Sequence, residues 1–119
     1  MGKKSKKHLM VLIGVILFIV LMLPFGSYAE INAAIRYMIN EKNVNALRYQ
    51  LDQGVDVNSR DEKGETLLIY AAKMNRPQIV KLLIEKGADV NAKDNSGKTA
   101  LDYAKEHNFS ETIKLLEPK

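Results

Sequence analysis

The acidic and amide side chains that alternate along residues 89–97 come nearest, in this sequence, to a site for metal chemistry. That alternation is typical of calcium loops, where carboxylate and carbonyl oxygens surround the ion. However, Lys93 takes the place of the fifth ligand, Asp94 that of the essential glycine and Ala100 that of the bidentate glutamate. We therefore predict no metal site and interpret these side chains as hydrogen-bonding groups of a turn. The same interpretation covers Asp56, Asn58 and Asp61.

His107 is the other residue with catalytic potential, because Asp102 and Glu106 lie near it in the sequence. A histidine beside carboxylates can shuttle protons. No cysteine, serine elbow or metal-ligand cluster accompanies it, and the glycines follow no phosphate-loop spacing. A solvated histidine near a helix end is the stronger interpretation. We predict that the chain is not an enzyme and needs no cofactor.

The net charge of +4 is confined to one end of this 119-residue chain, which has room for one modest domain. The whole excess comes from four lysines among the first seven residues, since the chain from Glu30 onward holds 14 basic and 14 acidic residues. The usual electrostatic signature of nucleic-acid binding is therefore missing. The absence of cysteine excludes disulfides, thiolate metal sites and the lipid attachment of a bacterial lipoprotein.

Residues 1–29 have the order of a secretory signal peptide. A cationic start precedes an unbroken run of fifteen apolar residues, 9–23. Pro24 would then end a helix, and small residues stand at the third and first positions before Glu30. We predict cleavage between Ala29 and Glu30, which would export the remaining chain to a bacterial periplasm or to the outside of the cell.

An uncleaved membrane anchor over residues 9–25 is the alternative, with the lysines held in the cytoplasm. In a bacterium it would make the protein a single-pass protein of the inner membrane. The apolar run would reach only about 22 Å as a helix, against about 30 Å of hydrocarbon. We therefore prefer the cleaved signal. Both interpretations place residues 30–119 on the far side of a membrane.

Residues 61–93 recur along the chain at a fixed period, which is the step from Asp61 to Asp94. Shifted forward by that step, ten of them fall on identical residues between 94 and 116, and a backward shift matches four more. Such a period predicts a stacked array in which each repeat buries its apolar face against its neighbours. The forward identities are those of Asp61, Gly64, Thr66, Leu68, Tyr70, Ala71, Asn75, Lys81, Leu82 and Leu83, and the backward ones those of Gly87, Asp89, Val90 and Asn91.

Each repeat predicts two short helices. Residues 66–74 indicate the first, with small and aliphatic side chains on its packing side. Asn75 tolerates the positive φ that a tight reversal requires. Pro77 suits the first turn of a second helix, and Gly87 suits a left-handed end. The order is therefore helix, reversal, helix, glycine and extended loop.

These residues resemble ankyrin repeats. Residues 66–71, Thr-Leu-Leu-Ile-Tyr-Ala, stand where that family has Thr-Pro-Leu-His-x-Ala, and residues 87–92 match its Gly-Ala-Asp-Val-Asn-Ala nearly letter for letter. The resemblance covers residues 54–119. It implies an all-α solenoid of helix-turn-helix units with short extended loops, preceded by the N-terminal signal or anchor helix. It also implies that the chain acts by binding another protein.

Three repeats are expected after the predicted signal of residues 1–29. Residues 30–60 lack the Asp-x-x-Gly-x-Thr turn and are interpreted as a degenerate N-terminal cap, with Asn43 capping the second helix. Residues 61–93 form the complete repeat. Residues 94–119 have a more polar second helix, capped by Ser110, and are interpreted as the C-terminal cap. Ile69 and Asp102 replace the histidine of the family, which implies a less rigid loop side.

In ankyrin repeats, partners are bound by the non-consensus positions of the turn and first helix, which line the concave face. Here that face has mixed charge, which favours a polar protein surface as partner. We expect a monomer of the inhibitor, immunity or protective scaffold type. The residues carried over are Glu62, Lys63, Glu65, Lys73, Met74, Lys93, Asn95, Ser96, Lys98, Glu106 and His107, with Ile69 either as an apolar anchor or packed in the interior.

Overall fold

The computed structural model of the chain describes residues 9–17 and 28–118. The cationic start, the end of the apolar run and the break at Pro24 lie outside the described residues, so the signal peptide stays a prediction. The chain divides into two compact parts, residues 1–34 and 35–119, and each is described by itself.

In the first part, residues 9–17 form a helix, and most of its apolar side chains are exposed. Among the described residues, no helix is both long enough and apolar enough to cross a membrane. Helix α2 (Tyr28–Asn40) begins in this part and ends in the second. Ala29 and Glu30, the predicted cleavage pair, lie in its first turn.

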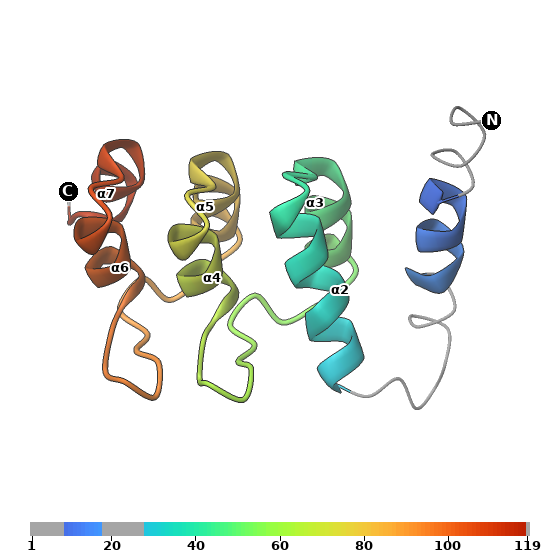
Figure 1. Cartoon of the computed structure of the whole chain (residues 1–119), viewed down its shortest axis with the longest axis horizontal. Coiled ribbons are helices and arrows are strands. Elements are labelled where there is room, and N and C mark those ends of the chain that lie inside the picture. Colours follow the sequence, from blue (N-terminus) through green and yellow to red (C-terminus); the bar gives the residue numbers. More distant parts are fainter. Residues whose placement is uncertain (1–8, 18–27, 119) are drawn as a thin grey trace. The chain divides into compact units, whose positions relative to one another are not determined.

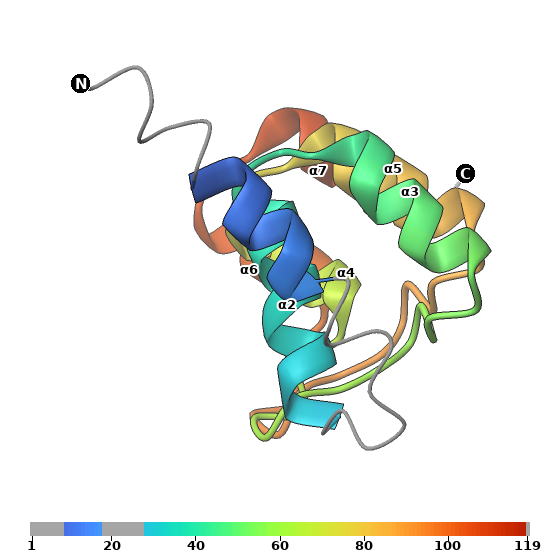
Figure 2. The same cartoon turned by 90° about the vertical axis from the view of Figure 1, so that its right-hand side faces the viewer.

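In the second part, the helices follow one another as pairs, each joined by a tight reversal (Figure 1). The helices that begin the second and third pairs, α4 and α6, pack against each other. The helices that end the three pairs, α3, α5 and α7, pack in succession (Figure 2). Apart from one isolated bridge between Arg60 and Thr66, the described secondary structure is helical, as predicted. The helices are α3 (Val44–Asp52), α4 (Leu67–Lys73), α5 (Pro77–Glu85), α6 (Ala100–Glu106) and α7 (Ser110–Leu116).

The reversals between paired helices use a left-handed residue at equivalent positions of the repeat. Asn75 and Asn108 have φ values of 53° and 57°, which confirms their predicted role. Lys42 takes the same place in the first repeat with a φ of 55°. Unlike asparagine, lysine has no short side chain that could form a hydrogen bond within the turn. The left-handed conformation of Lys42 therefore depends more on the surrounding structure than on the residue type.

Side chains cap the first turns of α3, α4 and α6. The hydroxyls of Thr66 and Thr99 accept the N–H groups of Ile69 and Asp102, and Asn43 caps α3 as predicted. The prediction for Ser110 is wrong. The helix already includes Ser110, and Phe109 stands at the cap without a side-chain hydrogen bond.

The core lies between the stacked pairs. Aliphatic side chains of α4 and α5 fill most of it, α2 adds Ile35, Met38 and Ile39, and α3 and α6 contribute smaller numbers. The predicted packing residues Leu68, Val80 and Leu83 are at most 1% exposed. Burying each such side chain stabilises the fold by roughly 1.5–3 kcal/mol. The second repeat therefore holds most of the interior.

The extended loops are joined from repeat to repeat by polar contacts. Asn58 accepts the N–H of Asp89 at 2.8 Å, and Arg60 donates to the carbonyl of Lys93 at 2.6 Å. Asn95 donates its side-chain amide to the carbonyl of Glu62 at 3.1 Å. These contacts connect the loop side although the histidine of the ankyrin pattern is absent.

The carboxylates of the predicted turns accept main-chain N–H groups two residues further on, at 2.9 Å. The interpretation of these side chains as turn-forming groups is therefore confirmed. The four carboxylates are those of Asp56, Asp61, Asp89 and Asp94.

Candidate protein-binding surface

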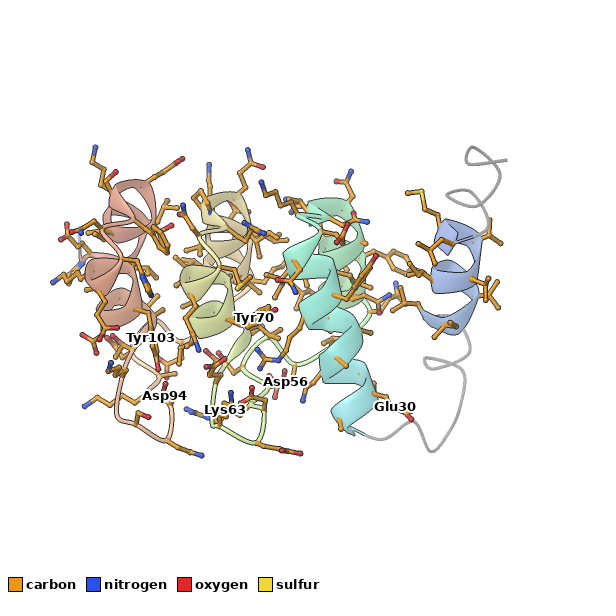
Figure 3. The ribbon with its side chains drawn as sticks, in the orientation of Figure 1. Glu30, Asp56, Lys63, Tyr70, Asp94 and Tyr103 are labelled. Carbon is orange, nitrogen blue, oxygen red and sulfur yellow. The ribbon has the colours of Figure 1, made fainter. Side chains whose placement is uncertain are left out.

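The turn–helix face is the name we give to two neighbouring surfaces. Each consists of the loop that precedes α4 or α6 and the following part of that helix up to its C-terminal end. Figure 3 shows Tyr70 and Tyr103 on the helices, with Lys63 and Asp94 in the loops. The main-chain N–H of Asn95 donates to the carbonyl of Lys63 at 3.0 Å, which fixes one loop against the next. The turn–helix face comprises residues 61–66 and 70–74 of the second repeat and residues 94–99 and 103–107 of the third.

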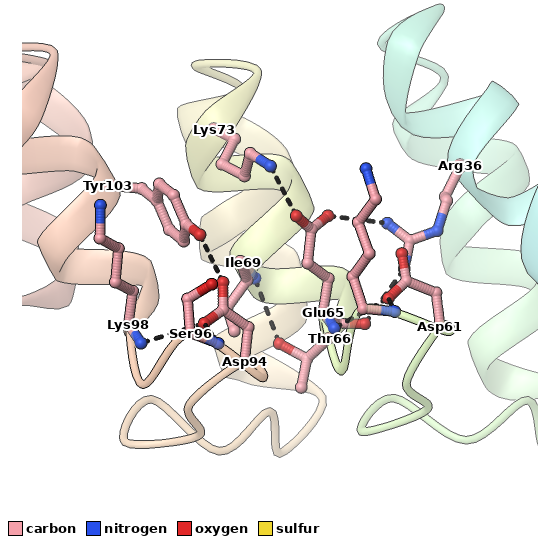
Figure 4. A network of polar contacts seen from close by, with 11 residues as sticks. Arg36, Asp61, Glu65, Thr66, Ile69, Lys73, Asp94, Ser96, Lys98 and Tyr103 are labelled. Carbon is pink, nitrogen blue, oxygen red and sulfur yellow. Dashed lines mark hydrogen bonds and ion pairs between the residues drawn. The ribbon is translucent and has the colours of Figure 1, made fainter.

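In the second repeat, an arginine from α2 holds the turn (Figure 4). Arg36 lies 3.2 Å from the carboxylate of Asp61 and 3.7 Å from that of Glu65. Glu65 also pairs with Lys73 at 2.5 Å. The guanidinium of Arg36 lies 4.7 Å from the ring centroid of Tyr70, within cation–π range.

Glu65 is only 5% exposed, so its charge needs these partners. A buried carboxylate without a cation loses solvation and gains nothing in exchange. Arg36 and Lys73 supply that compensation from two different repeats. The second turn is therefore fixed to both helices beside it.

In the third repeat, the turn is held from within. Asp94 accepts the hydroxyl of Tyr103 and the N–H groups of Ser96 and Lys98. The hydroxyl hydrogen bond is the main reason why the pKa of Asp94 is lowered. The same bond raises the pKa of Tyr103 to about 12.

A second contact of the third repeat lies at the surface. Lys98 pairs with Glu106 at 2.5 Å, and the hydrogen bond to Glu106 raises the pKa of Lys98. The ammonium groups of Lys73 and Lys98 lie 5.0 and 5.4 Å from the ring centroid of Tyr103. Two ammonium groups therefore lie near the ring of Tyr103, and the carboxylate of Asp94 binds its hydroxyl.

The difference between the two turns follows from one position. The equivalent of Arg36 in the next repeat is Ile69, which is 1% exposed and carries no charge. No arginine can therefore reach Asp94 from the preceding repeat as Arg36 reaches Asp61. Tyr103 supplies the hydrogen bond instead.

A family model for ankyrin repeats, in three copies, matches residues 31–119. The chain belongs to the ankyrin-repeat family. Comparison with curated proteins gave no match. Ankyrin repeats are generally protein–protein interaction modules and are generally not enzymes. Ten of the twelve residues predicted to bind a partner belong to the turn–helix face, and Ile69 and Lys93 lie just outside it.

Most of the predicted binding residues of this ankyrin array are accessible. Met74 is 37% exposed at the end of α4, and the side chain of Lys98 is 42% exposed. Lys73 is half-buried because it pairs with Glu65. The remaining exposed residues are Glu62, Lys63, Lys93, Asn95, Ser96, Glu106 and His107.

Two of the predicted residues are enclosed. Ile69 lies in the packed interior, which leaves it no part as an apolar anchor in this structure. Glu65 faces the helices beside it because Arg36 and Lys73 draw its carboxylate inward. The structure thus gives Glu65 and Ile69 internal roles and leaves the other ten residues for a partner.

His107 does not form a relay with its acidic neighbours. Its ring stacks on Phe109 with centroids 5.3 Å apart. The carboxylate of Asp102 accepts the N–H of Thr99 at 2.9 Å, which lowers the pKa of Asp102, and Glu106 pairs with Lys98. Among the described residues, no group of three potential metal ligands comes together.

Sequence reasoning missed Arg36 and the two tyrosines as members of this network. The signal was present in the repeat. Tyr70 and Tyr103 occupy equivalent positions of successive repeats. The pair Glu65–Lys73 recurs as Lys98–Glu106 with its charges exchanged. When the acidic and basic residues at two equivalent positions change places from one repeat to the next, the two side chains are expected to be in contact.

Proposed function

We propose that this ankyrin-repeat chain binds another protein through the exposed part of its turn–helix face and acts by occluding or scaffolding that partner. The observation that carries this proposal is the arrangement of charges. The carboxylate of Glu65 is buried, and its ion pairs with Arg36 and Lys73 hold the surface in shape, whereas the pair of Lys98 and Glu106 is accessible to solvent. A partner would meet a face that is already ordered, which reduces the entropy lost on binding.

The partner is expected to offer a polar surface of mixed charge. In the second repeat, Glu62 and Lys63 are adjacent exposed residues of the loop. In the third repeat, Lys98 and Glu106 form an ion pair that solvent reaches. Each repeat therefore presents one positive and one negative side chain. Met74 adds an apolar contact between the charged groups. Complementary charges would then set the orientation and the rate of encounter.

The proposed place of action is outside the cytoplasm, in a bacterial periplasm or the medium, after removal of residues 1–29. The order of charges and apolar residues in this segment supports the proposal. An inhibitor, immunity protein or protective scaffold of the envelope would suit a small exported binder without catalytic groups. A form tethered to the membrane through residues 9–25 is the alternative.

Partner capture tests the binding proposal. A photoreactive amino acid at Met74 would link the partner in intact cells, and the variants Lys63→Glu and Lys98→Glu should each weaken the linked band. Asn45→Lys, at an exposed position of α3, changes charge away from the turn–helix face and should leave the band unchanged. An equally strong band in both charge-reversed variants would contradict the proposal.

Intact mass measurement of the exported protein tests the location. We expect a mature chain that begins at Glu30. A chain that begins at Met1 and stays with membranes after a high-salt wash would replace the cleaved signal with the tethered form. A full-length chain in the soluble cytoplasmic fraction would contradict both.

A further inference from the structure

The first helix pair carries a polar side chain in its interior. We give this name to residues 35–52, which comprise α3 and the portion of α2 that belongs to the second part of the chain. Gln50 of α3 is only 6% exposed. Its side-chain oxygen is buried, and none of the described residues donates a hydrogen bond to it. Burial of such an oxygen removes its hydration without compensation, which favours any form of the protein that exposes it.

The other repeats show that this amide departs from the pattern. The residues equivalent to Gln50 are Leu83 in the second helix pair and Leu116 in the third. Leu83 is fully buried, and Leu116 is 6% exposed. Gln50 and Leu116 are therefore equally buried and differ in their chemistry. A polar group at this position weakens the interior of the first helix pair alone.

Contacts from the second repeat fix the ends of the same pair. The guanidinium of Arg76 donates to the carbonyls of Ile39 and Asn40, at the end of α2, at 3.3 and 3.2 Å. Lys86 of α5 pairs with Asp52, at the end of α3, at 2.5 Å. Because both helix ends are held while the amide weakens the interior, we expect the pair to open as one unit.

Arg36 joins the first helix pair to the turn of the second repeat (Figure 4). Its guanidinium donates to the main-chain carbonyl of Glu65 at 3.1 Å and lies 3.2 Å from the carboxylate of Asp61. Asp61 and Glu65 close the turn through two hydrogen bonds. The N–H of Asp61 donates to the carbonyl of Glu65 at 3.0 Å, and the N–H of Glu65 donates to the carboxylate of Asp61 at 2.9 Å. If α2 moves away, both residues lose their contact with Arg36.

The turn of the third repeat is closed without such a link. Asp94 and Lys98 form the two equivalent hydrogen bonds, at 2.9 and 3.0 Å. The carboxylate of Asp94 accepts a further hydrogen bond from Tyr103 of the same repeat. These contacts do not involve the first helix pair, so the third turn serves as an internal control.

We propose that the first helix pair is a conformational switch for the second-repeat part of the turn–helix face. In the closed form, Arg36 holds Asp61 and Glu65. In the open form, Gln50 regains water and the second turn loses its order, while the third turn keeps its own contacts. A partner that contacts the second turn would bind the closed form and thereby close the pair. This consequence rests on the proposed function, whereas the opening is a property of the chain alone.

Amide hydrogen exchange of the full chain without a partner, followed by NMR, tests the switch. Gln50→Leu installs the residue of the other two repeats and should slow exchange in the first helix pair. The N–H groups of Leu47 in α3 and of Glu65 in the turn should slow by the same factor, roughly fivefold to a hundredfold. The equivalent N–H of the third turn, that of Lys98, should keep its wild-type rate.

Two further variants separate the causes. Gln50→Met keeps a long, unbranched side chain without the amide, so it should slow exchange at both N–H groups as Gln50→Leu does. Arg36→Leu removes the link between the pair and the turn. In a chain with Arg36→Leu, the change Gln50→Leu should still slow exchange at Leu47 and should leave Glu65 unaffected.

Three outcomes would overturn the proposal. One is exchange at Leu47 that neither variant of Gln50 slows, because the amide would then not open the pair. Another is slower exchange at Leu47 without a change at Glu65, which would separate the turn from the pair. The third is an equal slowing at Lys98, which would mean that the whole array opens together. Since no partner is present, each outcome can be told apart from a failure of the partner-binding proposal.

Discussion

The turns of the second and third repeats occupy equivalent positions and satisfy their aspartates in different ways. Asp61 receives Arg36 from the preceding repeat, whereas Asp94 receives Tyr103 from its own. The acid next to the turn of the second repeat, Glu65, is buried, while its counterpart in the third repeat, Lys98, has 42% of its side chain exposed. The second repeat uses its charges to join helices, and the third presents them.

This difference shows which part of the turn is fixed and which can vary. In both repeats the aspartate caps two main-chain N–H groups, and this contact comes with the loop itself. The group that reaches its second oxygen depends on the neighbouring repeat. One residue, Arg36 or Ile69, decides whether the network crosses between repeats.

Loss of the arginine should have the largest effect on stability. Arg36→Leu leaves Glu65 with Lys73 alone and removes the cation beside Asp61, so the free energy of unfolding should fall by about 3 kcal/mol. Urea denaturation measures this. The double variant Arg36→Leu with Glu65→Leu should recover part of the loss, since no buried carboxylate remains. A loss below about 0.5 kcal/mol, the range of a surface pair, would contradict the buried network.

The two loop glycines should differ next. Gly64 and Gly97 have φ values of 72° and 79°, so alanine is strained at both. A Cβ at Gly64 would lie 2.4 Å from the side-chain oxygen of Asn95 and 3.0 Å from its main-chain nitrogen, whereas none of the described atoms lies within 4 Å at Gly97. Gly97→Ala should cost about 1 kcal/mol.

Gly64→Ala should cost roughly twice as much, because the clash adds to the strain. Thermal unfolding of both variants measures the difference. Equal costs would show that the loop contact through Asn95 gives way easily. The pair thus tests how firmly the second and third loops are joined.

Removal of the tyrosine hydroxyl should have a smaller, pH-dependent effect. Because the folded pKa of Asp94 is lowered, its contribution to stability is present above the usual carboxyl pKa and is lost as the pH falls through the folded value. Tyr103 has the opposite sign: its contribution is present below pH 10 and is lost as the pH rises through about 12. Tyr103→Phe should remove the dependence that comes from the tyrosine and reduce that of Asp94, which keeps its hydrogen bonds from the main-chain N–H groups of Ser96 and Lys98.

Carboxyl chemical shifts in an NMR titration would follow this change. The pKa of Asp94 should rise toward its usual value in Tyr103→Phe, because the hydrogen bond from the hydroxyl is lost. Tyr70→Phe, at the equivalent position of the second repeat, serves as the matched control and should leave the pKa of Asp94 unchanged. An unchanged pKa of Asp94 in Tyr103→Phe would contradict the hydrogen bond.

An exchange of charges should have the smallest effect on stability. The double variant Lys98→Glu with Glu106→Lys gives the third repeat the polarity of Glu65 and Lys73 while keeping an exposed pair. Exposed pairs contribute little, so we expect the same melting temperature as the wild type. Each single variant should also melt near the wild type. A clear loss of stability in the double variant would show that the order of charges is structural.

Sequence alone could predict the helices, the reversals at Asn75 and Asn108, and the turn carboxylates, because each depends on local residues or on the spacing of the repeat. It also predicted the family. It placed Ser110 wrongly at a cap because serine suits both that position and the first turn. The inward direction of Glu65 depends on Arg36, which is 29 residues away in the chain. The binding positions were predicted from the pattern of each repeat by itself, so they could not reveal a contact between two repeats.

Partner capture with the charge-exchanged chain tests the central claim, that the second repeat holds the turn–helix face in shape and the third presents charges to a partner. Wild type and the Lys98→Glu, Glu106→Lys double variant would carry the same photoreactive residue at Met74 and be compared for melting temperature and linked partner. We predict equal melting temperatures and a lost or strongly weakened partner band for the double variant. Equal capture by both chains would contradict the claim.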